Sequence, residues 1–255
     1  RLPLRDLLAP AVRLAREGVA VTVGGAEIAR DKGQELRTQP GAYARTFEPA
    51  GHALVAGDIV KQEKLADTFE ALATEGLRSF YRGSLAEMVA ADLARLGSPV
   101  ALADLHDHRA AAPAPLACRL RDAQLFNTSP PTQGLASLLI LALYDRLPQP
   151  AREGFEHVHQ IVEATKQAFL IRDGELGDPA FMSFVPQALL ADQLALDAMA
   201  ANISPDRAIP WPRGGIPSDT TWFAVADCRG QVVSAIQSTY FEFGSGVVLP
   251  RTGIV

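Results

Sequence analysis

The residues with the clearest chemical potential lie near the end of the chain, at Ser218, Asp219, Thr220 and Thr221. They follow a stretch rich in proline and glycine and precede a segment with the apolar, β-branched composition of a strand. A threonine hydroxyl at the mouth of a hairpin can attack a carbonyl carbon if a base lies beside it, because an unassisted hydroxyl is a weak nucleophile. Spacing alone leaves a second interpretation open, in which both threonines simply begin the strand.

A β-hairpin is expected to position these hydroxyls. Strands are predicted over residues 222–226 and 232–238, joined by a turn over residues 227–230 that contains a glycine. Irregular connections are predicted over residues 110–115, rich in alanine and proline, and over residues 203–218. The second connection leads directly into the candidate site.

Helices are predicted to supply most of the chain before the hairpin. Apolar residues at helical spacing predict helices over residues 6–17 and 64–75, which end at Gly18 and Gly76. Glycine suits such ends because it adopts the left-handed backbone conformation without strain.

Three further helices have other signals. Ser84 and Glu87 form an S-x-x-E capping box, which predicts the start of a helix that closes at Gly97. Residues 135–144 predict a buried helix that is too short to span a bilayer. Residues 153–172 predict a long core-facing helix whose apolar side carries Phe155, Val158, Ile161, Val162, Thr165, Ala168 and Phe169.

Composition disfavours several classes of protein. The chain has 255 residues, 48% of them hydrophobic, and a net charge of -5 without a basic block, so a nucleic acid is a poor partner and a soluble globular protein is expected. Its two cysteines, Cys118 and Cys228, lie far apart, which indicates neither a disulfide framework nor a zinc site and suits a reducing compartment.

The histidines do not indicate a metal site. His106 and His108 lie among aspartates but lack a third ligand at zinc spacing, so a solvated loop is the better interpretation. His157 and His159 point about 200° apart on a helix and cannot share one ion. No phosphate-binding glycine loop and no Gly-x-Ser-x-Gly elbow are present, and no cofactor is expected.

Several motifs in one order resemble a known family. The run from Thr220 to Asp227, together with Gln237 to Pro250 and Thr252-Gly253-Ile254, is similar to the start of the small subunit of the gamma-glutamyltranspeptidase family. Segments similar to the large subunit precede it, namely Leu7 to Ala15, Phe80 to Gly83, Ile161 to Lys166, Arg172-Asp173 and Gly177 to Pro179.

The resemblance implies a four-layer αββα sandwich of the N-terminal-nucleophile hydrolase type. It also implies self-cleavage between Asp219 and Thr220, so that residues 1–219 belong to a large subunit and residues 220–255 begin a small one. The freed α-amino group, with an ordinary pKa of about 7.7 to 8.0, can then act as the base for the Thr220 hydroxyl. Maturation and catalysis would share one hydroxyl.

Other site residues follow from the same resemblance. Ser238 falls where the family uses a hydroxyl to hydrogen-bond the nucleophile. Glu242 is either a polar group near the substrate or a structural carboxylate. Gly244-Ser245-Gly246 is interpreted as a chain bend rather than an anion site. The oxyanion-hole glycines of the family are expected beyond Val255.

Two departures bear on the substrate. Tyr240 stands where the glutamyl-transferring members use asparagine, and Ser129 to Leu135 replaces their loop ending in Gly-Gly. Both changes resemble the branch that includes oxamate amidohydrolase, and a bulkier tyrosine favours a small acid amide over glutathione. A gamma-glutamyl hydrolase or transferase is the alternative.

A third alternative is an unprocessed scaffold that keeps the fold without activity. The partners expected otherwise are a small amide and the two subunits of one precursor, with a homo-oligomer as a further option. A cytoplasmic location is expected, although the absence of an initial Met leaves room for a removed signal peptide and a periplasmic or secreted protein.

Overall fold

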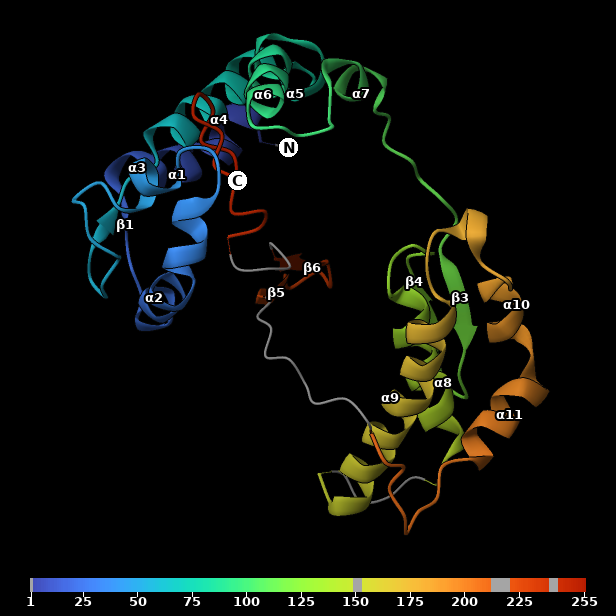
Figure 1. Ribbon diagram of the computed structural model, residues 1–255. Coiled ribbons are helices and arrows are strands. Elements are labelled where there is room, and N and C mark those ends of the chain that lie inside the picture. The colour runs from blue at the N-terminus through green and yellow to red at the C-terminus, as the bar shows by residue number, and fades with distance from the viewer. Residues whose placement is uncertain (1, 149–152, 212–220, 239–242) are drawn as a thin grey trace. The chain divides into compact units, whose positions relative to one another are not determined.

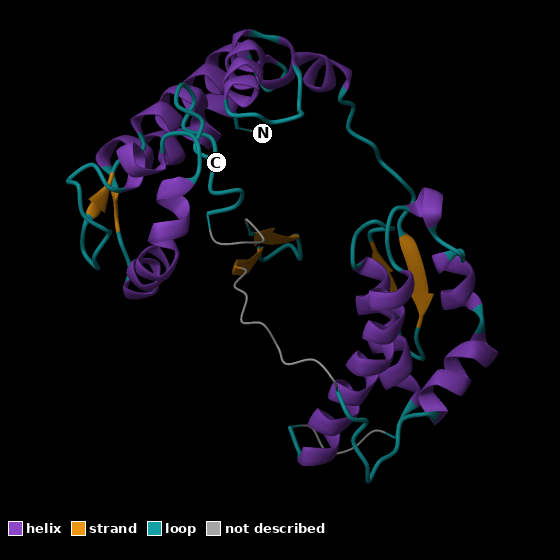
Figure 2. Ribbon diagram, viewed as in Figure 1, coloured by secondary structure: helices purple, strands orange, loops and turns teal. Residues whose placement is uncertain are grey.

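The computed structural model describes residues 2–148, 153–211, 221–238 and 243–255. The chain divides into two compact units: unit 1 contains residues 1–109 and 216–255, and unit 2 contains residues 110–215. The predicted irregular connection at residues 110–115 coincides with the start of unit 2. Helices predominate in both units, and the described strands pair into three two-stranded sheets (Figure 2).

The described part of unit 1 is built from seven helices, a sheet of two two-residue strands, and the hairpin β5–β6 (Figure 1). Its elements are α1 (Leu4–Glu17), β1 (Val19–Ala20), α2 (Val23–Thr38), α3 (Tyr43–Phe47), β2 (Ile59–Val60), α4 (Glu63–Glu75), α5 (Ser79–Arg82), α6 (Ser84–Arg95), α7 (Leu102–Asp107), β5 (Thr221–Ala226) and β6 (Val232–Gln237).

Unit 2 combines a small hairpin with helices, of which α9 is the longest. Its elements are β3 (Leu116–Arg119), β4 (Gln124–Asn127), α8 (Gly134–Arg146), α9 (Phe155–Glu175), the 3-10 helix η1 (Pro179–Phe181), α10 (Pro186–Ala191) and α11 (Gln193–Ala201).

In unit 1, two helices end directly before the glycines at which the sequence predicts their ends. Helix α1 starts two residues earlier than predicted and ends before Gly18, whose φ of 95° and N–H bond to the Leu14 carbonyl close the last turn. Helix α4 ends before Gly76 in the same way, with a φ of 87°. The two helices pack together, and Arg16 of α1 binds Asp67 and Glu70 of α4 at 2.9 and 2.7 Å.

The predicted capping box at the start of α6 is wrong, although the helix itself is present. Gly83 is the residue that caps α6, and no side chain accepts a hydrogen bond at this position. Ser84 is already the first helical residue, and its hydroxyl instead donates to the Glu75 carboxylate of α4 at 3.3 Å. The Ser84 hydroxyl, which the sequence pattern predicted to cap the helix, is therefore hydrogen-bonded to Glu75 instead.

The core of unit 2 forms around α8, as its continuous apolar sequence predicted. Seven residues of α8 are buried, and strand β3 and helices α9, α10 and α11 pack against it. The buried set is Leu116, Cys118, Leu135, Leu138, Leu139, Ala142, Leu143, Leu147, Ala164, Ala168, Leu190, Leu196, Ala200 and Ile203. β3 and β4 pair antiparallel, with Leu116 opposite Asn127.

Helix α9 is present, but of the face predicted to be buried only Ala168 is buried. Phe155 and Val158 are 75% and 54% exposed, whereas Gln160, Glu163, Ala164 and Gln167 are buried with Ala168. Apolar spacing misled here because α9 turns polar side chains inward, where at least one of them binds the backbone of a passing segment.

Candidate functional site

The predicted hairpin that carries the candidate residues is present. β5 and β6 pair antiparallel, with Trp222 opposite Ile236 and Val225 opposite Val233. Trp222 Nε1–H donates to the Ser234 hydroxyl across the strands at 2.9 Å.

The turn between the strands is held by Asp227. Its carboxylate accepts hydrogen bonds from the N–H groups of Arg229 and Gln231 at 2.8 and 3.0 Å, and the Gln231 bond is the main reason why its pKa lies below the ordinary range. Gly230 adopts a φ of 80° in this turn, a conformation that favours glycine. The Asp227 hydrogen bonds and the Gly230 conformation together stabilise the turn that joins β5 to β6.

The open end of the hairpin is formed by the first residue of β5 and the last residue of β6. Thr221 pairs with Gln237, so the residues that flank this last pair in sequence are Thr220 and Ser238. Ser238 is described and exposed, one residue beyond β6. Asp219, Thr220, Tyr240 and Glu242 lie outside the described residues.

The Gly244-Ser245-Gly246 stretch forms a turn, as predicted. Gly244 and Gly246 have φ values of 58° and 72°, and the Gly246 N–H donates to the Phe243 carbonyl at 2.9 Å. The Ser245 hydroxyl accepts from the Val247 N–H at 3.2 Å. These bonds are internal to the turn, which agrees with its interpretation as a bend.

Helix α9 binds the segment that leads toward the candidate site. Residues 203–211 are irregular, as predicted, and carry their backbone past His159, Glu163 and Lys166, which lie on one side of α9. His159 Nε2 lies 2.8 Å from the Ser204 carbonyl oxygen. Glu163 accepts from the Ile209 N–H at 3.0 Å, and Lys166 donates to the Ile209 carbonyl at 2.8 Å.

We call His159, Glu163 and Lys166 the α9 anchor. Glu163 and Lys166 also pair with each other at 2.5 Å, and their side chains are 1% and 16% exposed. Burial raises the pKa of Glu163, but hydrogen bonds from Lys166 and the Ile209 N–H outweigh it and hold the pKa below its ordinary value of 4.5. The carboxylate is therefore stabilised in its charged form inside unit 2.

Replacing Glu163 by glutamine should lower the free energy of unfolding by about 3 kcal/mol, because it leaves the Lys166 ammonium buried without its counter-charge. Glu35→Gln is the matched control, since Lys32 and Glu35 are also a helical pair three residues apart, but their side chains are 32% and 55% exposed. That change should cost less than about 0.5 kcal/mol. Urea unfolding of the full-length variants measures both, and equal effects would contradict the role of the buried pair.

The contribution of Glu163 to the free energy of unfolding should also depend on pH. A carboxyl whose pKa is lowered by folding stabilises the native state above its unfolded pKa, and this stabilisation is lost as pH falls through the folded value. The stability difference between the unmodified protein and Glu163→Gln should therefore be constant near neutrality and shrink below pH 4.5, the ordinary pKa. A difference that grows on acidification would contradict the assignment.

The two cysteines differ in accessibility. Cys118 lies in the unit 2 core, 2% exposed, and burial raises the pKa of its thiol, whereas Cys228 is exposed in the hairpin turn. A thiol reagent should label Cys228 rapidly in the native protein and Cys118 only after unfolding, since the reactive species is an accessible thiolate. Mass mapping of the labelled peptides measures this, and rapid native labelling of Cys118 would contradict the packing.

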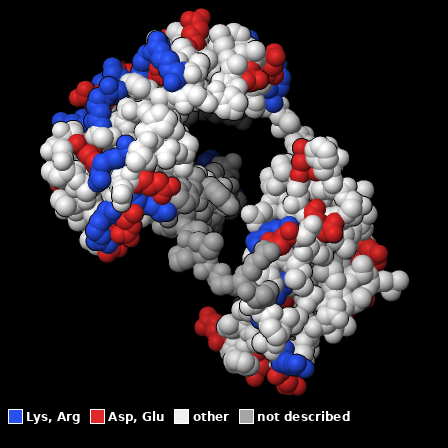
Figure 3. Space-filling view, viewed as in Figure 1, with Lys and Arg blue, Asp and Glu red and all other residues white. Residues whose placement is uncertain are grey.

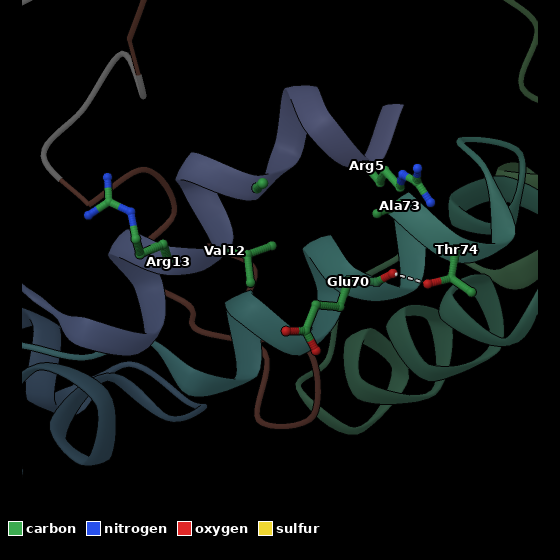
Figure 4. A pocket seen from close by; sticks show the side chains of 7 residues that line it. Arg5, Val12, Arg13, Glu70, Ala73 and Thr74 are labelled. Atoms are coloured by element: carbon green, nitrogen blue, oxygen red, sulfur yellow. Dashed lines mark hydrogen bonds between the residues drawn. The ribbon is translucent and has the colours of Figure 1, made fainter. Parts of the chain in front are cut away.

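Two surface hollows are lined by residues outside the hairpin. One, of about 290 Å³, lies between α1 and α4, and Figure 4 shows the residues that line it, including Arg5, Val12 and Glu70. The Thr74 hydroxyl donates to the Glu70 carbonyl there at 2.8 Å. The other, of about 500 Å³, is lined in unit 2 by Arg119, Leu120, Arg121, Asp145, Arg146, Gln193 and Asp197. Ser238 lines neither hollow.

His106 and His108 are exposed, as predicted, but they do not both lie in a loop. His106 belongs to α7 rather than to a loop, and the His108 ring stacks on Tyr81 at 4.9 Å. His157 contacts the Tyr144 hydroxyl at 2.7 Å, a different partner from that of His159. Among the described residues, no group of three or more His, Cys, Asp or Glu side chains is arranged to hold a metal ion.

Charges of both signs are interspersed on the surface. In the view of Figure 3, Lys and Arg alternate with Asp and Glu over the helices of unit 1. Over the parts of the chain that are described, no helix is long and apolar enough to cross a membrane.

The sequence matches the family model of gamma-glutamyltranspeptidase over residues 1–255, so the chain belongs to the gamma-glutamyltranspeptidase family. This match confirms the family that the sequence motifs around the hairpin resemble.

Two curated proteins are similar to the chain along its whole length. The chain is 47% identical to the oxamate amidohydrolase proenzyme of Klebsiella pneumoniae over 254 residues, covering 100% of this chain and 48% of that protein. It is 37% identical to the glutathione hydrolase-like YwrD proenzyme of Bacillus subtilis, covering 100% of this chain and 48% of that protein. The chain thus spans about half the length of the curated relatives that it matches.

Solved structures agree with the predicted fold class. The cephalosporin acylase of Bacillus halodurans is 32% identical, with a TM-score of 0.81, covering 100% of this chain and 47% of that one. The gamma-glutamyltranspeptidase of Helicobacter pylori is 25% identical, with a TM-score of 0.72, covering 82% of this chain and 61% of that one. The α+β fold of the N-terminal-nucleophile hydrolase type is confirmed.

Proposed function

We propose that this protein is a self-cleaving amidohydrolase in which Thr220 is the nucleophile. The observation that carries the proposal is the family match along the whole chain, which includes the hairpin whose open end is flanked by Thr220 and Ser238. The word proenzyme in the names of the similar curated proteins supports a precursor that is processed into subunits. In this proposal residues 1–219 form the large-subunit part and residues 220–255 begin the small subunit.

Maturation would use the same hydroxyl as catalysis. The Thr220 hydroxyl attacks the carbonyl carbon of Asp219, an ester replaces the peptide bond, and the Thr220 nitrogen becomes a free amine. Water then hydrolyses the ester, which releases the Asp219 carboxylate and restores the hydroxyl. Before this step the Thr220 nitrogen is an amide without basicity, so cleavage switches the site on.

Turnover follows from the freed amine. It accepts the hydroxyl proton as the oxygen attacks the substrate's amide carbon, then gives a proton to the departing ammonia. Water hydrolyses the resulting acyl ester and frees the acid product. A base with an ordinary pKa of about 7.7 to 8.0 is partly neutral at working pH, which suits both transfers.

Ser238 has a supporting role in the proposal. The β5–β6 register supports this role, because Ser238 directly follows Gln237, the partner of Thr221. A hydroxyl there can donate to the nucleophile's oxygen and orient it. Glu242 and Tyr240 are proposed on the substrate side.

The proposed substrate is a small acid amide such as oxamate. Tyr240, in place of the asparagine of the glutamyl-transferring members, is bulkier and lacks an amide group, which favours a short substrate. The 47% identity to an oxamate amidohydrolase proenzyme supports the same choice. The free thiols Cys118 and Cys228 support a cytoplasmic location.

A gamma-glutamyl hydrolase or transferase is the second candidate, favoured by the 37% identity to a glutathione hydrolase-like proenzyme. The purified full-length protein should release ammonia from oxamate with a kcat/KM at least about 100-fold above its value for a chromogenic gamma-glutamyl anilide. Preference for the anilide would replace the first proposal by the second. Activity on neither substrate, with one uncut chain on a denaturing gel, would favour the inactive scaffold.

A further inference from the structure

The last described stretch of the chain, residues 243–255, differs from the hairpin before it in how it is packed. We call it the C-terminal segment. None of the described residues 221–238 is buried, whereas Val248, Leu249 and Thr252 of the segment are 1%, 4% and 0% exposed. The segment reaches its partners within unit 1, where Figure 1 draws it in red beside α4.

One anchor of the segment is an ion pair with α6. The Arg251 N–H and Nε–H donate to the two oxygens of Asp92 at 3.0 and 2.7 Å, and a further guanidinium N–H donates to the Met88 carbonyl at 2.9 Å. Asp92 is 1% exposed and the Arg251 side chain 37%. Because the Asp92 carboxylate accepts hydrogen bonds from both the backbone and the side chain of Arg251, it holds that residue in place and also pairs with its positive charge.

A second anchor joins the segment to α4. The Thr68 hydroxyl donates to the Thr252 carbonyl at 2.7 Å in a buried position. Gly253, with a φ of 69°, passes so close to α4 that an added Cβ would lie 2.6 Å from the Leu65 nitrogen. Only glycine fits this approach, because a side chain would clash with the backbone of α4 and would also disfavour the positive φ.

Apolar contacts with α2 and α3 complete the docking. Val248 packs with Leu36, Ala42 and Tyr43 in a buried cluster, and its carbonyl accepts from the Ala42 N–H at 2.9 Å. The Phe243 ring meets the Tyr43 and Phe47 rings edge to face at 5.3 and 5.2 Å.

Every partner of these anchors precedes residue 219, and the segment follows residue 220. We infer that the C-terminal segment helps to lock the fragment beginning at Thr220 onto the 1–219 fragment once the chain is cut, with Asp92–Arg251 as the main polar anchor within this segment. The inference rests on the proposed self-cleavage for its biological meaning. Its physical basis is the set of non-covalent contacts between the two sides of the junction.

The test separates the lock from the self-cleavage. A recognition site for a specific protease is placed within residues 212–219 of the full-length Thr220→Ala precursor, which is cut after folding. Native mass spectrometry over a dilution series then measures dissociation of the fragments. Asp92→Asn, which leaves Arg251 without its counter-charge, should weaken association roughly 100-fold or more.

Two further variants keep the test interpretable. Gly253→Ala should weaken association through a clash at α4 without altering any charge. Arg95→Gln is the matched control, because Arg95 also lies near Asp92, at 3.8 Å, but is 70% exposed and belongs to the same fragment as Asp92. Circular dichroism of each uncut variant establishes that it folds.

The lock is supported if Asp92→Asn and Gly253→Ala release the fragment at concentrations where the parent and Arg95→Gln remain associated. It is overturned if all four cut proteins dissociate at the same concentration. Failure of self-cleavage is detected separately, as an unbroken chain in the protein that retains Thr220 and carries no inserted site.

Discussion

Replacing Thr220 by alanine should leave the full-length precursor uncut and lower kcat for amide hydrolysis by about 10⁴-fold or more. Both effects have one cause, because the hydroxyl that opens the Asp219–Thr220 bond is the hydroxyl proposed to attack the substrate. The measurements are a denaturing gel for the cut and ammonia release for turnover.

Two matched variants sharpen this result. Thr220→Ser keeps a hydroxyl and should restore the cut, with turnover reduced but measurable. Thr221→Val removes the neighbouring hydroxyl, which lies on the first residue of β5, and should leave the chain cut at the same bond. Normal processing of Thr220→Ala, or loss of processing only in Thr221→Val, would refute the choice of nucleophile.

Ser238→Ala should lower kcat by roughly 100-fold with little change in KM, because a hydrogen bond to the reacting oxygen matters most in the transition state. The same variant should slow self-cleavage, since the two reactions share the nucleophile. The hairpin register supports this expectation by joining Ser238 directly to the residue that pairs with Thr221.

Ser234→Ala tests whether such a loss is specific. Ser234 lies on the same strand and binds Trp222 across the hairpin, so its removal perturbs the hairpin but alters neither Ser238 nor the last pair, Thr221–Gln237. It should change kcat less than about threefold, whereas Ser238→Thr should recover most of the lost rate. Equal losses in Ser234→Ala and Ser238→Ala would show that both act through hairpin stability alone.

Local signals in the sequence predicted the elements that depend on local chemistry. Gly18 and Gly76 end their helices because the positive φ at each position favours glycine, and Asp227 with Gly230 defines the hairpin turn. Helix α2 was missed because Gly24, Gly25 and Gly33 lower its intrinsic helix propensity, although Thr22 caps it through the Gly25 N–H at 3.0 Å.

Interactions across long sequence separations could not be predicted in this way. The polar buried side of α9 depends on the backbone of Ile209, 46 residues from Glu163, and apolar periodicity cannot reveal a carboxylate whose partner lies so far along the chain. The Asp92–Arg251 pair joins residues 159 positions apart. No spacing rule links such residues before the fold brings them together.

The candidate site was predicted by resemblance rather than by spacing. From the residues alone, the plain start of a strand was the better interpretation of Thr220 and Thr221, and the structure confirms only the hairpin that begins at Thr221. The family match adds the expectation of chemistry at this position. Tyr240 and Glu242 stay predictions because their roles depend on a substrate.

The most direct test is to determine the N-terminal sequence of the fragments of the purified, unmodified full-length protein. Two species are expected, the second of which begins Thr-Thr-Trp-Phe and has a free α-amine on Thr220. A single unbroken chain that nevertheless hydrolyses the amide, or a second fragment that begins at another residue, would contradict this expectation.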